Sequence, residues 1–132
     1  MLVIDTSAAL TALLAVESPV GLAERIIEDG DLHAPHLIDT EVLHALRRLT
    51  LNRELSEERA ADTRTEFAEL AVTRYPHQPL SDRVWELRHN LTAYDATFIA
   101  LAEALDAPLV TCDARLASSA GHHADVDLFS TR

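Results

Sequence analysis

The sequence predicts an α/β fold, in which a mostly parallel sheet is flanked by helices. Short apolar runs at residues 2–4 and 108–112 are bounded by turn signals, as expected for strands buried on both faces. The longer stretches between them carry apolar residues at helical spacing. Strands that alternate with helices in this way favour a parallel sheet, because each crossover helix carries the chain back to the starting edge.

The individual elements follow from their start and stop signals. The expected strands span residues 2–4, 32–34, 71–75, 108–112 and 126–129. The expected helices span residues 8–14, 19–29, 35–51, 57–70, 80–89, 93–105 and 114–120. The helices over 35–51 and 57–70 are expected to form an antiparallel hairpin.

Several capping residues support these boundaries. Thr6 or Ser7 is expected to cap the first helix, and Pro19 to be the first residue of the second. Gly30 is expected to end that second helix, since a helix commonly stops at a glycine. Trp85, within the helix over 80–89, is expected to lie in the core.

Composition restricts the class of protein. A chain of 132 residues is large enough for a hydrophobic core, and one domain spanning residues 1–132 is expected. No apolar run approaches the length of a membrane span. Cys112, the single cysteine, allows no internal disulfide, which fits the reducing cytoplasm. It lies in an apolar run and is expected in the core rather than as a nucleophile.

The charge balance is strongly acidic. The net charge is −11, from 22 acids and 11 bases, and every base is arginine. This argues against tight non-specific binding of nucleic acid. It does not exclude a nucleic-acid substrate, because salt screens long-range repulsion and bound divalent cations would offset some of the acids.

Acidic side chains stand where a functional site is expected. Asp5 and Asp113 each follow a buried strand directly and precede a helix, so parallel neighbouring strands would bring both to one sheet edge. Asp95 lies within the apolar stripe of its helix and therefore faces the interior or a cleft. Glu41 and Asp39 flank the apolar stripe of the helix over 35–51 on opposite sides, and helical periodicity does not choose between them.

The electrostatic repulsion between carboxylates that converge on one place has to be compensated. At about 5 Å, each like-charged pair costs roughly 3 kcal/mol at an effective dielectric of 20. Such a cluster takes up protons or binds a cation. Oxygen donors without an organised cysteine or histidine set select Mg²⁺ or Mn²⁺. The hypothesis is therefore hydrolysis of a phosphodiester by a metal-activated water.

An ordered set of segments resembles a known family. The segments are Val3-Ile4-Asp5-Thr6-Ser7-Ala8, Glu41 in the helix after Pro35, Leu91-Thr92-Ala93-Tyr94-Asp95-Ala96 and Leu109-Val110-Thr111-Cys112-Asp113. Together they resemble the PIN-domain ribonucleases, specifically the VapC toxins of bacterial toxin–antitoxin pairs. The resemblance covers essentially the whole chain.

The resemblance implies a fold, an activity and partners. It implies a five-stranded parallel sheet between helices, with four catalytic and metal-binding acids at one end: Asp5, Glu41, Asp95 and Asp113. It thereby selects Glu41 over Asp39. It also implies Mg²⁺-dependent endonucleolytic cleavage of RNA, a homodimer and a cognate VapB-type antitoxin. Thr6 and Thr111 match hydroxyl positions beside the acids, where they would orient the carboxylates.

Other functions remain to be separated from this one. A PIN-fold module that only binds protein, or a PIN nuclease of RNA processing that is not a toxin, would share the fold. A phosphatase with an aspartyl nucleophile usually needs a second Asp where Ser7 stands, and a response-regulator receiver needs a lysine. A dinucleotide-binding domain needs a glycine-rich loop, and this chain has three glycines.

Overall fold

The computed structural model describes residues 1–15 and 17–130. Its strands are β1 (Leu2–Ile4), β2 (Leu32–Pro35), β3 (Val72–Tyr75), β4 (Leu109–Thr111) and β5 (Val126–Leu128). Its α-helices are α1 (Thr6–Leu14), α2 (Leu22–Asp29), α3 (Leu37–Leu51), α4 (Glu57–Glu69), α5 (Ser81–Glu86), α6 (Ala93–Leu105) and α7 (Ala114–Ala117). A 3₁₀ turn, η1 (Gln78–Leu80), precedes α5.

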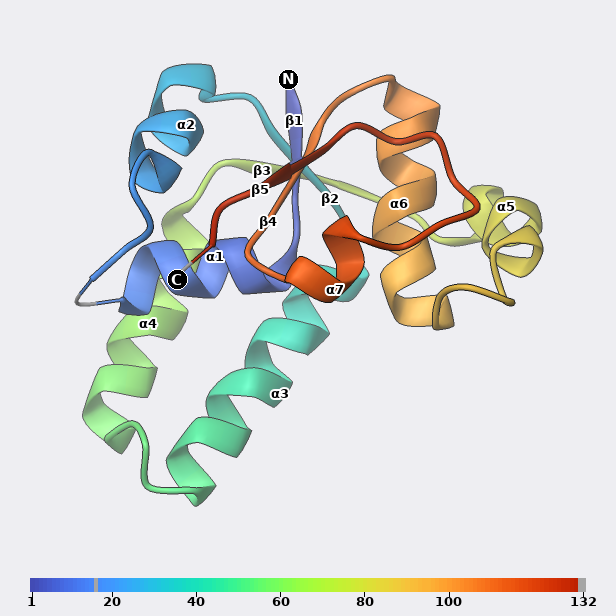
Figure 1. The fold of residues 1–132 in the computed structure, drawn as a ribbon. Helices are drawn as coiled ribbons and strands as arrows, with labels where there is room; N and C mark the ends of the chain where they lie inside the picture. Colours follow the sequence, from blue (N-terminus) through green and yellow to red (C-terminus); the bar gives the residue numbers. More distant parts are fainter. Residues whose placement is uncertain (16, 131–132) are drawn as a thin grey trace.

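The five strands form one parallel sheet in the order β3-β2-β1-β4-β5. The α/β prediction with a five-stranded parallel sheet is therefore confirmed. β1 is the central strand, and Leu2, Val3 and Ile4 are all 0% exposed. Figure 1 shows α1 and α2 on one side of the sheet and α5 and α6 on the other. This cover on both faces explains why the central strands are continuously apolar.

The order of the strands determines where a site can form. β1 pairs with β2 on one side and with β4 on the other, so the chain reverses its direction of winding at β1. In open parallel sheets, ligands bind beyond the carboxyl ends of the strands at such a switch point. The residues that follow β1 and β4 therefore lie where a ligand is expected.

Helices α3 and α4 pack against each other and against α1. Figure 1 shows them side by side, projecting away from the sheet. The Ser56 hydroxyl caps α4 by accepting from the Arg59 N–H. Among the described residues, no helix is long and apolar enough to span a membrane.

Several predicted boundaries were wrong. α7 ends at Ala117 rather than at residue 120, because the chain leaves the helix at Ser118. α2 begins at Leu22 rather than Pro19, because Gly21 has a φ of +87°, which is left-handed and incompatible with a helix interior. Pro35 ends β2, and α3 begins at Leu37. α1 is capped by the Asp5 side chain rather than by Thr6 or Ser7.

Trp85 was predicted to be in the core, but it is 67% exposed. The predicted helix over 80–89 is shorter in the structure, where α5 ends at Glu86. Leu80 and Leu87, on the same segment, are buried instead and anchor it against α6. The anchoring of this segment therefore does not depend on burial of the tryptophan.

Candidate active site

Asp5 stands at the junction between β1 and α1. Its backbone is extended, and its Oδ1 accepts a hydrogen bond of 2.9 Å from the Ala8 N–H. The side chain therefore caps the helix, and it also lines a pocket beyond the sheet edge. Capping and a position in the pocket are thus compatible, since the helix N-terminus and the sheet edge coincide here.

The Asp5 carboxylate is almost fully enclosed, at 7% exposure. It accepts hydrogen bonds from the hydroxyls of Thr111 and Ser7. Burial raises the pKa of Asp5 above its ordinary value, hydrogen bonds from Thr111, Ala8 and Ser7 oppose that rise, and the nearby charge of Asp113 adds to it. Asp5 consequently holds a proton more readily than an exposed aspartate does.

Asp113 and Asp95 approach the same pocket from different elements. Asp113 follows β4 and caps α7, accepting from the N–H groups of Arg115 and Leu116. Asp95 lies in the first turn of α6, where the Thr92 hydroxyl accepts from its N–H. Thr92 is therefore the N-cap of α6. β1 and β4 are parallel neighbours, as the expected placement of Asp5 and Asp113 at one sheet edge requires.

A single arginine connects these two acids. Nη2 of Arg115 lies 3.0 Å from Oδ2 of Asp95 and 3.1 Å from Oδ2 of Asp113. The hydrogen bond to Asp95, followed by the charges of both acids, raises the pKa of the Arg115 guanidinium. One positively charged nitrogen thus reaches both carboxylates at once.

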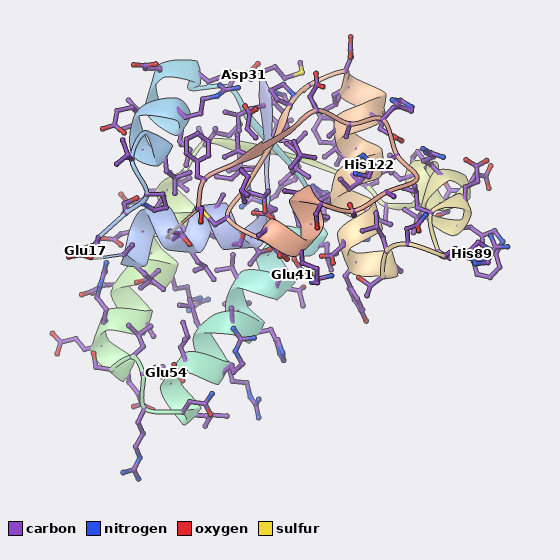
Figure 2. All side chains as sticks on the ribbon, in the orientation of Figure 1. Glu17, Asp31, Glu41, Glu54, His89 and His122 are labelled. Atoms are coloured by element: carbon purple, nitrogen blue, oxygen red, sulfur yellow. The ribbon has the colours of Figure 1, made fainter. Side chains whose placement is uncertain are left out.

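The structure distinguishes Glu41 from Asp39. The Thr6 hydroxyl donates a hydrogen bond of 2.6 Å to Glu41, which lines the same pocket as Asp5. Figure 2 shows Glu41 near the start of α3, below α7. Asp39 instead accepts two hydrogen bonds, of 2.7 and 2.8 Å, from the guanidinium of Arg74 on β3. Asp39 is therefore engaged away from the pocket.

The pocket has a volume of about 290 Å³. Its lining combines acids, hydroxyls, one histidine, one arginine and apolar side chains: Asp5, Thr6, Ser7, Leu10, Glu41, His44, Ala45, Arg48, Asp95, Phe98, Asp113 and Leu116. All four predicted acids line this pocket. Within residues 1–15 and 17–130, no group of three His, Cys, Asp or Glu side chains is placed so that it could hold one metal ion. The donor atoms are carboxylate and hydroxyl oxygens, which suit a hard cation.

Sequence reasoning missed part of this site. Arg115 was not singled out, although it lies two residues after a predicted acid in the first turn of a helix. Ser7 was considered only as a cap, but its hydroxyl accepts from the Cys112 N–H and donates to Asp5. Arg48 also lines the pocket, and it has no carboxylate partner among the described residues.

Residues 2–121 match the model of the PIN domain family, so the chain belongs to that family. Relatives within it are VapC ribonucleases. The chain is 48% identical to Ribonuclease VapC9 of Mycobacterium tuberculosis over 122 residues, which cover 90% of this chain and 91% of that protein. It is 42% identical to Ribonuclease VapC1 of the same species over 127 residues, 96% of each chain. The resemblance inferred from the sequence is confirmed.

A solved structure with the same fold is VapBC2 of Rickettsia felis, bound to a DNA fragment from its promoter. It superposes with a TM-score of 0.71 over 96% of this chain and 97% of that chain, at 12% sequence identity. At this identity the similarity concerns the fold.

Proposed function

We propose that this chain is a metal-dependent endoribonuclease and the toxin of a VapBC pair. The supporting observation is that Asp5, Glu41, Asp95 and Asp113, which come from four separate parts of the chain, line one pocket at the switch point of the sheet. Membership of a family whose named relatives are VapC ribonucleases supports the choice of RNA as substrate.

Mg²⁺ is the proposed cofactor, and Mn²⁺ is expected to substitute for it. Asp95 and Asp113 are the proposed direct ligands, and the support for this choice is that one Arg115 nitrogen contacts both carboxylates. Asp5 and Glu41 would act through water, since Mg²⁺ retains several waters in protein sites. When bound, the metal would lower the pKa of a water and stabilise the charge that develops on the phosphodiester.

The remaining polar groups orient the acids. The Thr111 and Ser7 hydroxyls direct Asp5, and the Thr6 hydroxyl directs Glu41. The two hydroxyls and the Ala8 N–H use three of the roughly four lone pairs of the Asp5 carboxylate, whereas the Thr6 hydroxyl uses one of those on Glu41. The raised pKa of Asp5 makes this side chain the proposed acceptor of a proton from the attacking water.

Cleavage of total RNA by the purified chain tests the activity. The reactions contain Mg²⁺, Mn²⁺ or EDTA, and they compare wild type with Asp95→Asn and with Asp62→Asn, an exposed acid on α4 outside the pocket. Discrete fragments are expected from wild type and Asp62→Asn with metal only. Folded wild type that yields no fragments would refute the nuclease and favour a PIN module that only binds protein.

The toxin assignment has a separate test. Induced expression of wild type, but not of Asp95→Asn, is expected to arrest bacterial growth, and co-expression of a VapB-type antitoxin is expected to restore it. RNA cleavage without growth arrest would indicate a PIN nuclease of RNA processing instead. A homodimer is also proposed, and light scattering of the purified chain tests it. The net charge of −11 fits a basic partner.

A further inference from the structure

Arg115 contacts the carboxylate oxygens that a ligand of the acids would need. Its Nη2 donates hydrogen bonds of 3.0 Å to Oδ2 of Asp95 and 3.1 Å to Oδ2 of Asp113. Oδ1 of Asp113 already accepts from the N–H groups of Arg115 and Leu116, so Oδ2 is the oxygen that remains for a ligand. The guanidinium and a divalent cation therefore compete for the same two oxygens, since two positive charges repel each other there.

The Arg115 side chain is weakly held in this position. It is 68% exposed, whereas the other arginines in ion pairs have side chains that are 27–38% exposed: Arg25, Arg59, Arg74 and Arg83. Exposed ion pairs add little to stability, because water and salt screen them and ordering the long side chain costs entropy. A divalent cation can therefore displace the guanidinium without any loss of packing.

A displaced guanidinium stays close to the acids. Arg115 follows Asp113 by two residues and is fixed at its backbone in the four-residue helix α7. Both of its contacts with the acids use Nη2, which leaves the hydrogens on Nε and Nη1 for a further acceptor. A phosphodiester that binds over the acids brings negatively charged oxygens to this place, and the planar guanidinium fork matches the spacing of phosphate oxygens.

We propose that Arg115 is a catalytic residue with two positions: it pairs with Asp95 and Asp113 in the empty site, and it binds a non-bridging oxygen of the cleaved phosphate in the occupied site. The inference rests on the proposed function and adds a residue to it. In the second position, Arg115 stabilises the negative charge that grows on the phosphate as water attacks phosphorus and the bond to the leaving oxygen breaks.

Arg115 moves no proton in this reaction, because a guanidinium stays protonated in proteins. The attacking water gives its proton to Asp5, as proposed above, and the leaving oxygen takes a proton from solvent. The arginine acts through its charge and its hydrogen bonds alone.

Two binding measurements on the full chain test the two positions. Mn²⁺ is titrated calorimetrically, and dimethyl phosphate, a simple phosphodiester anion, is titrated by its ³¹P relaxation in the presence of protein and Mn²⁺. Arg115→Ala is expected to bind Mn²⁺ more tightly but dimethyl phosphate about tenfold more weakly, as the loss of a hydrogen bond between charged groups predicts. Arg115→Lys keeps the charge without the fork, so it is expected to bind the diester with intermediate affinity. Arg64→Ala, which removes the same charge from the exposed face of α4, is the matched control and is expected to equal wild type in both titrations.

The initial rate of RNA cleavage at saturating Mn²⁺ is the third measurement. Arg115→Ala is expected to cleave on the order of 100-fold more slowly than wild type, since it lacks a group that acts on the charge of the transition state. Arg115→Lys is expected to recover part of this rate, and Arg64→Ala to retain all of it. Thermal melts of the variants are expected to match wild type, because the side chain is exposed and packs against little.

The outcomes separate this inference from the proposed nuclease. Unchanged affinity of Arg115→Ala for dimethyl phosphate would overturn the inference, and tighter Mn²⁺ binding alone would then mean that the arginine only fills the empty site. Weaker binding of both Mn²⁺ and the diester would also overturn it, because Arg115 would then support the metal site. Diester binding that depends on Arg115, in a folded wild type that cleaves no RNA, would support the phosphate contact and refute the nuclease.

Discussion

Thr111→Val tests how the candidate site is held together. The Thr111 side chain is fully buried at the end of β4, and its hydroxyl donates to Asp5 and accepts from the Asp113 N–H at 3.0 Å. Valine keeps the shape and removes the hydroxyl. Loss of a hydrogen bond to a charged group costs about 1.5–3 kcal/mol. With an unfolding entropy of about 280 cal/mol/K for 132 residues, the melting temperature should fall by about 5–11 °C.

The same substitution should make the loss of stability depend on pH. The hydrogen bond from Thr111 lowers the pKa of Asp5, so its removal raises a pKa that burial has already raised. Asp5 has a higher pKa in the folded protein than the value of about 3.9 that it has in the unfolded chain. Such a carboxyl contributes its full stabilisation at a pH below the unfolded pKa, and this stabilisation is lost as the pH rises through the folded pKa. The variant should therefore be closest to wild type in stability at acidic pH and furthest from it at neutral pH.

Urea unfolding of wild type and Thr111→Val between pH 4 and pH 8 measures both effects. Thr63→Val is the matched control, because Thr63 is also fully buried but donates its hydrogen bond to the backbone carbonyl of Arg59. The control should lose about 1 kcal/mol at every pH. An equal, pH-independent loss in both variants would refute the view that Thr111 acts through a charged Asp5.

Three further predictions concern single acids and their partners. Asp5→Asn should lose RNA cleavage, because the amide carries no negative charge and cannot accept the proton that the proposed mechanism assigns to Asp5; a variant that cleaves RNA like wild type would contradict this. Arg115→Ala should bind Mn²⁺ more tightly in calorimetric titration, because it removes a cation that spans Asp95 and Asp113; weaker binding would show that the arginine supports the metal. Glu41→Gln should abolish RNA cleavage, whereas Asp39→Asn should retain it. Asp39→Asn should lower the free energy of unfolding in thermal melts by about 1 kcal/mol or less, because the ion pair of Asp39 with Arg74 is partly exposed. Equal activity of the two variants would show that Glu41 has no catalytic part.

The strands that carry acids were predictable from local pattern. Asp5 and Asp113 each follow a buried apolar run, and the run and the acid are both visible in the sequence. Asp95 was predictable because a carboxylate inside an apolar helical stripe has to face a cleft or a partner. In each case the signal lies within a few residues of the acid.

Contacts that join distant segments were not predictable in this way. The choice between Glu41 and Asp39 depends on Arg74, which lies 35 residues after Asp39 and approaches it through the pairing of β2 with β3. Helical periodicity contains no such information, and the family resemblance had to supply the choice.

For Trp85, the local pattern made a prediction that was wrong. Its size and apolar ring predict burial, but the segment is anchored by its leucines and the ring lies beside Arg88 at the surface. Arg115 was overlooked because an arginine on a short helix is ordinarily a solvated side chain. Its role depends on Asp95 lying 20 residues earlier in the chain and beside it in space.

The long separation between Asp5 and Thr111 affects how the protein is made. Synthesis proceeds from the amino end, so the strand at the centre of the sheet leaves the ribosome first and its partner β4 follows more than a hundred residues later. Until then a nascent chain carries Asp5 without the Thr111 hydroxyl and without Asp113. A prematurely terminated product, or a fragment cut before β4, therefore lacks Asp113 and the Thr111 hydroxyl, so its site is incomplete. The proposed nuclease should be harmless during its own translation and should become active only once nearly the whole chain has folded.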